Sequence, residues 1–157
     1  MQKFAVILLF AIVGSIYCEN YEFNECTKTV GEDDNVPDHY NCNVTAVRIS
    51  PCSEYPCKIK RGKKVALEVD FVSSVAVDTV ENDVYWASPE GDLEWQGLAK
   101  DGCANTQCPV AKDVQQSYTY SIDIDKKVPV RMYDVKWGFK SGDQVKCCAL
   151  IRIHIRK

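Results

Sequence analysis

The sequence predicts an all-β fold, either a β-sandwich or a β-barrel, and three observations carry that prediction. Polar and apolar residues alternate with a period of two in several runs, most clearly in Val65–Phe71. Turn-forming sequences such as Arg61-Gly62-Lys63 and Ser141-Gly142-Asp143 separate these runs. No segment after the first 18 residues repeats its apolar residues with the 3.6-residue period of an amphipathic helix. Several short strands at this spacing are typical of a sandwich or a barrel.

The first 18 residues predict a secretory signal peptide. Lys3 precedes an apolar run, Phe4–Val13, and small residues follow it, which is the order of the three regions of such a signal. The run is shorter than the roughly 20 apolar residues of a transmembrane helix. Cleavage after Cys18 leaves an even number of cysteines, whereas the alternative, cleavage after Ser15, leaves an odd one. We therefore expect a signal peptide over 1–18 and one secreted, extracellular domain over 19–157, with the lysosomal lumen as the alternative compartment.

Five alternating runs are the predicted strands, in the order Val44–Ile49, Val65–Phe71, Ser117–Ile124, Tyr133–Phe139 and Ile151–Ile155. Val44–Ile49 alternates only partly, whereas each of the other runs places apolar side chains on one face and polar side chains on the other, which suits antiparallel sheets. Two such sheets stacked face to face bury both apolar faces. The side chains expected between the sheets include Leu67, Val69, Phe71, Tyr118, Tyr120, Ile122, Ile124, Val135, Trp137, Ile151 and Ile153.

Charge and side-chain spacing argue against nucleic-acid binding, metal binding and catalysis. The formal net charge is −3 and no stripe of Lys and Arg is present, so we expect no nucleic-acid partner. His39 and His154 are the only histidines, and neither has metal-ligand spacing to another ligand, so we expect no metal and no cofactor. A catalytic cysteine would have to be free, whereas a secreted protein oxidises its cysteines. The chain is therefore predicted not to be an enzyme.

The remaining cysteines predict a disulfide framework. Two couples are each separated by five positions: Cys52 with Cys57, and Cys103 with Cys108. A bridge from Cys26 to Cys147 or Cys148 would tie the first strand to the last. Neighbouring strand residues point to opposite faces, so Cys147 and Cys148 should take different partners, which leaves Cys42 for the other one. Eight cysteines allow 105 pairings, so several alternatives stay open.

One covalent modification is predicted from a motif. Asn43-Val44-Thr45 matches the acceptor sequence for N-glycosylation, and a secreted chain passes the enzyme that uses it. Asn43 would not be glycosylated if its side chain faced into the sandwich.

A set of ordered motifs resembles a known family. The motifs are Cys26, Ser50-Pro51-Cys52 with Cys57 and Gly62, Val69–Phe71, Asp101-Gly102-Cys103 with Cys108-Pro109, Tyr118-Thr119-Tyr120, Val135-Lys136-Trp137 and Cys148. Together they are similar to the ML lipid-recognition domain. The branch that they resemble most holds the Niemann–Pick type C secreted sterol-binding protein, its arthropod relatives and the group 2 mite allergens.

The resemblance implies a particular fold and disulfide pairing. The family's fold is an immunoglobulin-like sandwich of two antiparallel sheets with a hydrophobic cavity between them. Its pairing, carried over to this chain, gives the bridges Cys26–Cys148, Cys52–Cys57 and Cys103–Cys108. Cys42 and Cys147 are additional to the family pattern, and we predict that they form a fourth bridge, with an exchange of partners between Cys147 and Cys148 as the alternative.

The resemblance also implies a function. We expect reversible, cofactor-free binding of a small lipophilic ligand (a sterol, fatty acid or semiochemical) for lipid transport or chemosensory delivery. The segment Asp92–Gly97 stands where the sterol-binding branch often has a Pro-rich entrance loop. The expected ligand contacts are the eleven inward-facing side chains given above together with Leu93 and Trp95. We expect a monomer that meets a membrane or receptor partner when it delivers the ligand. The alternative is a pattern-recognition cofactor that presents a lipid to a receptor of innate immunity.

Overall fold

The computed structural model describes residues 20–28 and 37–157, so the predicted signal peptide lies outside the described residues. This part of the chain is all β. The strands are β1 (Asn24–Glu25), β2 (Cys42–Ser50), β3 (Cys57–Lys60), β4 (Lys64–Ser73), β5 (Glu81–Ala87), β6 (Leu93–Glu94), β7 (Gln115–Asp123), β8 (Met132–Ser141) and β9 (Val145–Arg156).

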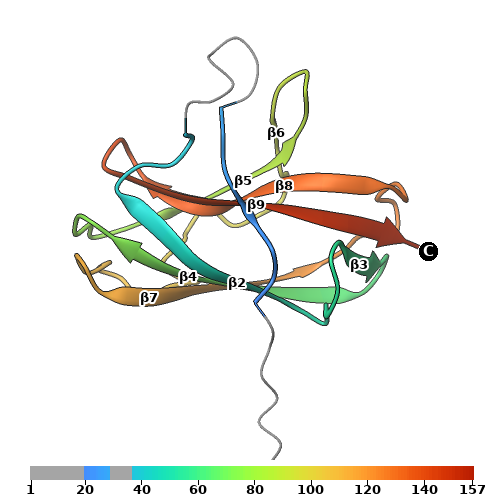
Figure 1. Ribbon diagram of the computed structural model, residues 1–157, viewed down its shortest axis with the longest axis horizontal. Helices are drawn as coiled ribbons and strands as arrows, with labels where there is room; N and C mark the ends of the chain where they lie inside the picture. Colours follow the sequence, from blue (N-terminus) through green and yellow to red (C-terminus); the bar gives the residue numbers. More distant parts are fainter. Residues whose placement is uncertain (1–19, 29–36) are drawn as a thin grey trace, which may run out of the picture.

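The strands form two sheets that stack as two layers, with β8 and β9 in one layer and β2, β4 and β7 in the other (Figure 1). The larger sheet has the order β1-β9-β8-β5-β6, and β3 pairs with β9 beside β1. The smaller sheet has the order β2-β4-β7. Strand pairs are antiparallel except for β3 with β9, which is parallel. The predicted all-β sandwich is confirmed.

The alternating sequences form the strands that were expected, and β2 shows why its alternation is imperfect. In β4 every second residue from Val65 to Ser73 is buried. In β2, Val44 lies opposite Phe71 whereas Ala46 lies opposite Asp70, so the register shifts between them. This β-bulge adds one residue to β2, so the inward-facing side chains are three positions apart at the bulge, from Val44 to Val47.

The strand β5 was not predicted, because a polar side chain lies on its inner face. Asn82 is 6% exposed and lies opposite Phe139 of β8. The Tyr118 hydroxyl donates a hydrogen bond of 2.7 Å to Asn82 Oδ1 across the sandwich. The Asn82 amide group donates in turn to the backbone oxygen of Ala99 at 2.8 Å. These bonds satisfy a buried amide, which would otherwise be costly. Because the inward-facing residue is polar, however, the sequence of β5 does not alternate.

One end of the space between the sheets is filled by aromatic packing. The ring of Phe71 lies edge-on to that of Phe139, with 4.7 Å between centroids. The ring of Tyr118 lies against Phe139 from another direction at 5.5 Å. All three side chains are almost fully buried. Aromatic pairs in these arrangements stabilise a core beyond the area that they bury.

Four disulfides connect the described residues: Cys26–Cys148, Cys42–Cys147, Cys52–Cys57 and Cys103–Cys108. They are the four pairs expected from the resemblance and from the two additional cysteines. Cys147 and Cys148 are neighbours in β9 and point to opposite faces. The bridge from Cys147 therefore crosses the sandwich to β2, whereas the bridge from Cys148 holds the segment that follows β1.

The outer face of β8 departs from the prediction that each strand has one wet face. Lys136, between Val135 and Trp137, is only 2% exposed. Its ammonium group pairs with Asp92 at 2.6 Å and with Asp38 at 3.5 Å, and it donates a hydrogen bond to the backbone oxygen of Thr27. Thr27, Asp38 and the β5–β6 connection, which contains Asp92, therefore cover this face of the larger sheet at Lys136. A period of two in one strand cannot predict that distant segments bury its polar side.

Further ion pairs continue across the same outer face. Asp38 also pairs with Lys146 at 2.9 Å, and Lys146 reaches Asp83 at 3.4 Å. Asp83, 4% exposed in its side chain, pairs with Lys140 at 2.8 Å. The hydrogen bond that Lys140 donates to Asp83 raises the pKa of Lys140. Burial acts to lower the pKa of Lys146, but the carboxylates of Asp38 and Asp83 outweigh it and the pKa is raised. We call the groups Asp92, Lys136, Asp38, Lys146, Asp83 and Lys140 the outer ion network.

Candidate functional site

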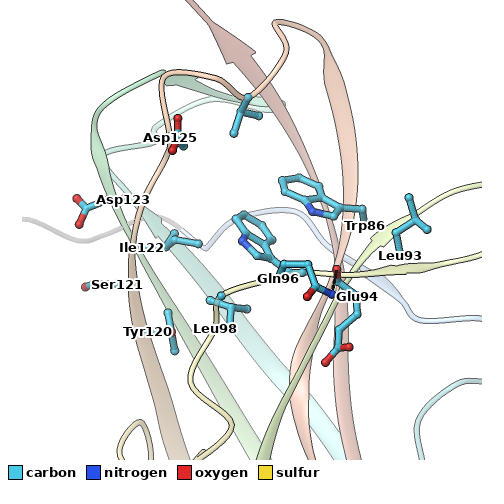
Figure 2. A pocket seen from close by; sticks show the side chains of 13 residues that line it. Trp86, Leu93, Glu94, Gln96, Leu98, Tyr120, Ser121, Ile122, Asp123 and Asp125 are labelled. Carbon is cyan, nitrogen blue, oxygen red and sulfur yellow. Dashed lines mark hydrogen bonds between the residues drawn. The ribbon is translucent and has the colours of Figure 1, made fainter.

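A cleft of about 800 Å³ opens between the β5–β6 hairpin of the larger sheet and β7 of the smaller sheet. Figure 2 shows Trp86 and Leu93 on one side of it and Tyr120 and Ile122 on the other. The full lining is Trp86, Leu93, Glu94, Trp95, Gln96, Gly97, Leu98, Tyr120, Ser121, Ile122, Asp123, Asp125 and Val128. A cleft of this volume lies in the usual range of small-molecule sites.

A second, inner space lies deeper between the two sheets. Its lining consists of apolar side chains: Ile49, Ile59, Val65, Leu67, Trp95, Ile122, Ile124, Val135, Trp137, Ile151 and Ile153. Its free volume is about 20 Å³, which is room for about one water molecule. Trp95 and Ile122 line both this inner space and the cleft, so the two spaces meet at these side chains.

Trp95 is held at that junction by two other tryptophans. Its ring stacks on Trp86 with centroids 4.0 Å apart and meets Trp137 edge-on at 5.5 Å. Its backbone N–H donates to the oxygen of Val84 at 2.9 Å, which fixes the chain beside β5. The ring therefore lies, with Ile122, on the boundary that the cleft and the inner space share.

The geometry agrees with the comparison against protein families, in which residues 20–155 match the ML domain. The chain belongs to the ML-domain family. Among curated relatives, an MD-2-related lipid-recognition protein of Manduca sexta is 28% identical, with 96% of each chain covered. The NPC intracellular cholesterol transporter 2 of Bos taurus is 25% identical, over 87% of this chain and 86% of the relative. Mite group 2 allergen Lep d 2 of Lepidoglyphus destructor is 29% identical, over 96% of each.

A solved structure supports the fold assignment. The crystal structure of a Niemann-Pick type C2 protein from Japanese carpenter ant superposes with a TM-score of 0.71. The match covers 87% of this chain and 100% of the other, at 20% sequence identity. At that identity the likeness shows the fold, and it agrees with the two stacked sheets of this ML domain.

The residues expected to contact a ligand divide into two groups in this ML domain. Ten of them line the cleft or the inner space: Leu67, Leu93, Trp95, Tyr120, Ile122, Ile124, Val135, Trp137, Ile151 and Ile153. The other three, Val69, Phe71 and Tyr118, line neither space. Phe71 and Tyr118 pack on Phe139 instead, at the filled end of the sandwich.

Sequence reasoning missed several lining residues, and two of them carried a usable signal. Ile49 and Val65 lie in alternating runs, on the same faces as Val47 and Leu67. Trp86 lies in β5, which was not predicted because Asn82 interrupts its apolar face. Gln96, Leu98 and Val128 come from connecting segments, where no periodicity predicts which side chains turn toward a cleft.

Burial sets the chemistry of the polar groups between the sheets. Burial raises the pKa of the Tyr118 hydroxyl, and the nearby Trp137 indole N–H lowers it by a smaller amount. Trp137 Nε1 completes no hydrogen bond with the residues that the structure describes.

Among the described residues no group of His, Cys, Asp and Glu could hold a metal ion, and no helix could cross a membrane.

The predicted glycosylation site faces outward. Asn43 and Thr45 are exposed on β2, which is an edge strand of the smaller sheet. We expect the protein, when secreted by eukaryotic cells, to carry a glycan here that an N-glycosidase removes with a shift in electrophoretic mobility. Asn43→Gln should abolish the shift, and Thr45→Ser, which keeps the acceptor sequence, should retain it. A shift that persists in Asn43→Gln would contradict the assignment.

Proposed function

We propose that this ML-domain protein is a secreted carrier that reversibly binds a small lipophilic ligand between its two sheets. One observation carries the proposal: an aromatic cleft meets an inner space of apolar side chains at Trp95 and Ile122. Apolar concave sites bordered by a few polar groups are the usual form of lipid and small-molecule sites. The printed names of the relatives, which include a lipid-recognition protein and a cholesterol transporter, support the same class of ligand.

Binding requires the interior to expand. An inner free volume of about 20 Å³ cannot hold a lipid chain, so the ligand must displace Trp95 and separate side chains of the two sheets. Burial of roughly 300 Å² of apolar ligand surface would contribute about 7 kcal/mol before the entropy costs of binding. Such a gain exceeds the cost of disturbing the contacts of one aromatic side chain, which are worth about 1 kcal/mol each.

The first test is displacement of a fluorescent apolar probe. We expect the probe to bind and to be displaced by members of a panel of sterols, fatty acids, fatty alcohols and volatile odorants. Failure of every compound to displace the probe, or failure of the probe to bind, would reject the carrier function.

A substitution at the junction sharpens this test. Ile122→Glu places a charge where the cleft meets the inner space. We expect it to weaken probe binding at least about tenfold, because transfer of a carboxylate from water to an apolar site costs free energy. The control is Thr119→Glu, which places the same charge on the exposed face of the same strand, β7. Equal probe affinities in the two variants would place the site elsewhere.

Presentation of a lipid to an innate-immune receptor stays the alternative. Of the large apolar side chains that line the cleft, Leu93 is the one that is exposed, at 66%. A protein-binding rim needs a contiguous apolar patch, and the described rim offers a single side chain. We therefore favour the carrier.

A further inference from the structure

The inner space is lined by no charged side chain and by no side chain that accepts a hydrogen bond from the polar end of a lipid. The eleven side chains that line it are aliphatic or are the rings of Trp95 and Trp137. The indole N–H groups of Trp95 and Trp137 are the hydrogen-bond donors among these side chains, so a polar group buried there would exchange its hydrogen bonds to water for at most those two. If the site binds a lipid, as proposed above, its apolar part must therefore point inward and its polar end must stay in the cleft.

The polar side chains that line the cleft are acidic or uncharged. Its polar lining residues are Glu94, Gln96, Ser121, Asp123 and Asp125. None of the described residues that line it is Lys, Arg or His. Figure 2 shows Ser121 and Asp123 on the side of β7 turned away from Trp86, so they border the opening of the cleft.

The cations near the cleft are engaged elsewhere or lie outside its lining. Lys100 pairs with Glu94 and is itself exposed. Asp123 and Asp125 form no ion pair with the residues that the structure describes, although Lys64 lies opposite Asp123 on β4. Asp125 Oδ1 accepts a hydrogen bond of 2.7 Å from the Lys127 backbone N–H.

We propose that the site selects uncharged lipids and discriminates against lipid anions such as fatty-acid carboxylates. A carboxylate in the cleft would lose hydration without meeting a cation, and the bordering aspartates would repel it. A hydroxyl group, in contrast, can donate to a carboxylate or amide oxygen of the cleft. An ester or ketone costs less than an anion, because it carries no charge that has to be desolvated.

The test uses ligands that share one C18 chain: oleate, oleyl alcohol and methyl oleate, each below the concentration at which it self-associates. At pH 7.4 and low salt we expect the alcohol and the ester to bind at least about tenfold more tightly than oleate. Gln96→Lys puts a cation into the lining, and we expect it to shift the oleate-to-alcohol affinity ratio toward oleate. The matched control Gln144→Lys, on the exposed turn between β8 and β9, should leave the ratio unchanged.

A second pair of variants tests the repulsion. Asp123→Asn with Asp125→Asn should narrow the discrimination, whereas Asp78→Asn with Asp143→Asn, which removes the same charge from exposed positions outside the cleft lining, should not. Oleate binding as tightly as the alcohol would overturn the inference and leave the carrier function standing. An oleate-to-alcohol affinity ratio that neither Gln96→Lys nor the pair Asp123→Asn with Asp125→Asn changes would also overturn it. Failure of all three ligands to bind, with no displacement of the probe by any compound of the panel above, would reject the carrier function itself.

Discussion

Replacing Lys136 with alanine is expected to lower the free energy of unfolding by about 3–5 kcal/mol. The side chain of Lys136 is 3% exposed, and its ammonium group lies between the carboxylates of Asp92 and Asp38. Without it, the largely buried carboxylate of Asp92 loses the ammonium group that pairs with it, and Asp38 is left with Lys146. The Thr27 backbone oxygen also loses a charged hydrogen-bond donor. Breaking a buried ion pair from one side is more costly than never having formed it, because the remaining charge stays desolvated.

Urea unfolding followed by circular dichroism measures the effect. The control is Lys60→Ala, which removes an exposed lysine from β3 that makes no ion pair with the described residues, and it should change the stability by less than about 0.5 kcal/mol. Equal stabilities of the two variants would mean that water reaches the outer ion network in solution. The network would then contribute no more than surface salt bridges do.

The two long-range disulfides should stabilise the fold in a strongly non-additive way. Removing either Cys42–Cys147 or Cys26–Cys148, by alanine at both of its positions, is expected to cost about 3 kcal/mol. Removing both is expected to cost about 8 kcal/mol, which exceeds the sum of the single effects.

The reason lies in the loops that the bridges close. Each bridge alone closes a long loop, with a sequence separation of 105 or 122. When one bridge is present, however, the other closes only the short circuit that runs from residue 26 to 42 and across the neighbouring positions 147 and 148, about 17 residues. Loop-closure entropy grows with the logarithm of loop length, so the second bridge restricts the unfolded chain less than the first.

Urea unfolding of the two single-bridge variants and of the double variant tests this expectation. The short bridge Cys103–Cys108, with a separation of five, serves as the comparison and should cost about 2 kcal/mol on its own. Additive losses from the two long-range bridges would contradict the loop argument, and would indicate that the unfolded chain keeps residues 26 and 42 close to 147 and 148 without them.

The fold could be predicted from the sequence wherever one face of a strand is apolar and the other polar. The strands β4, β7 and β9 obey this rule along most of their length, and their burial alternates as expected. The rule fails in β5, where Asn82 is polar but buried, and in β8, where Lys136 is polar but covered. In both strands the deciding contacts come from segments distant in sequence, so no local pattern contains them.

The candidate site could be predicted only in part, for a related reason. Alternation identifies which side chains point between the sheets, but it does not identify how far the sheets separate at each level. Leu67 and Phe71 lie on the same face of β4, yet Leu67 lines the inner space and Phe71 packs on Phe139. The difference depends on what the opposite sheet presents, an aliphatic lining at one end and an aromatic cluster at the other.

The tryptophan cluster has a consequence for spectroscopy. The chain has three tryptophans, and all of them lie in the stack of Trp86, Trp95 and Trp137 at the junction of the two spaces. All of the protein's tryptophan fluorescence therefore originates beside the place where a ligand would enter. Two indoles 4.0 Å apart also couple their electronic transitions, so rotation of the Trp95 ring would change the near-ultraviolet circular dichroism without any added label. The protein thus carries its own optical reporter of the opening of its interior.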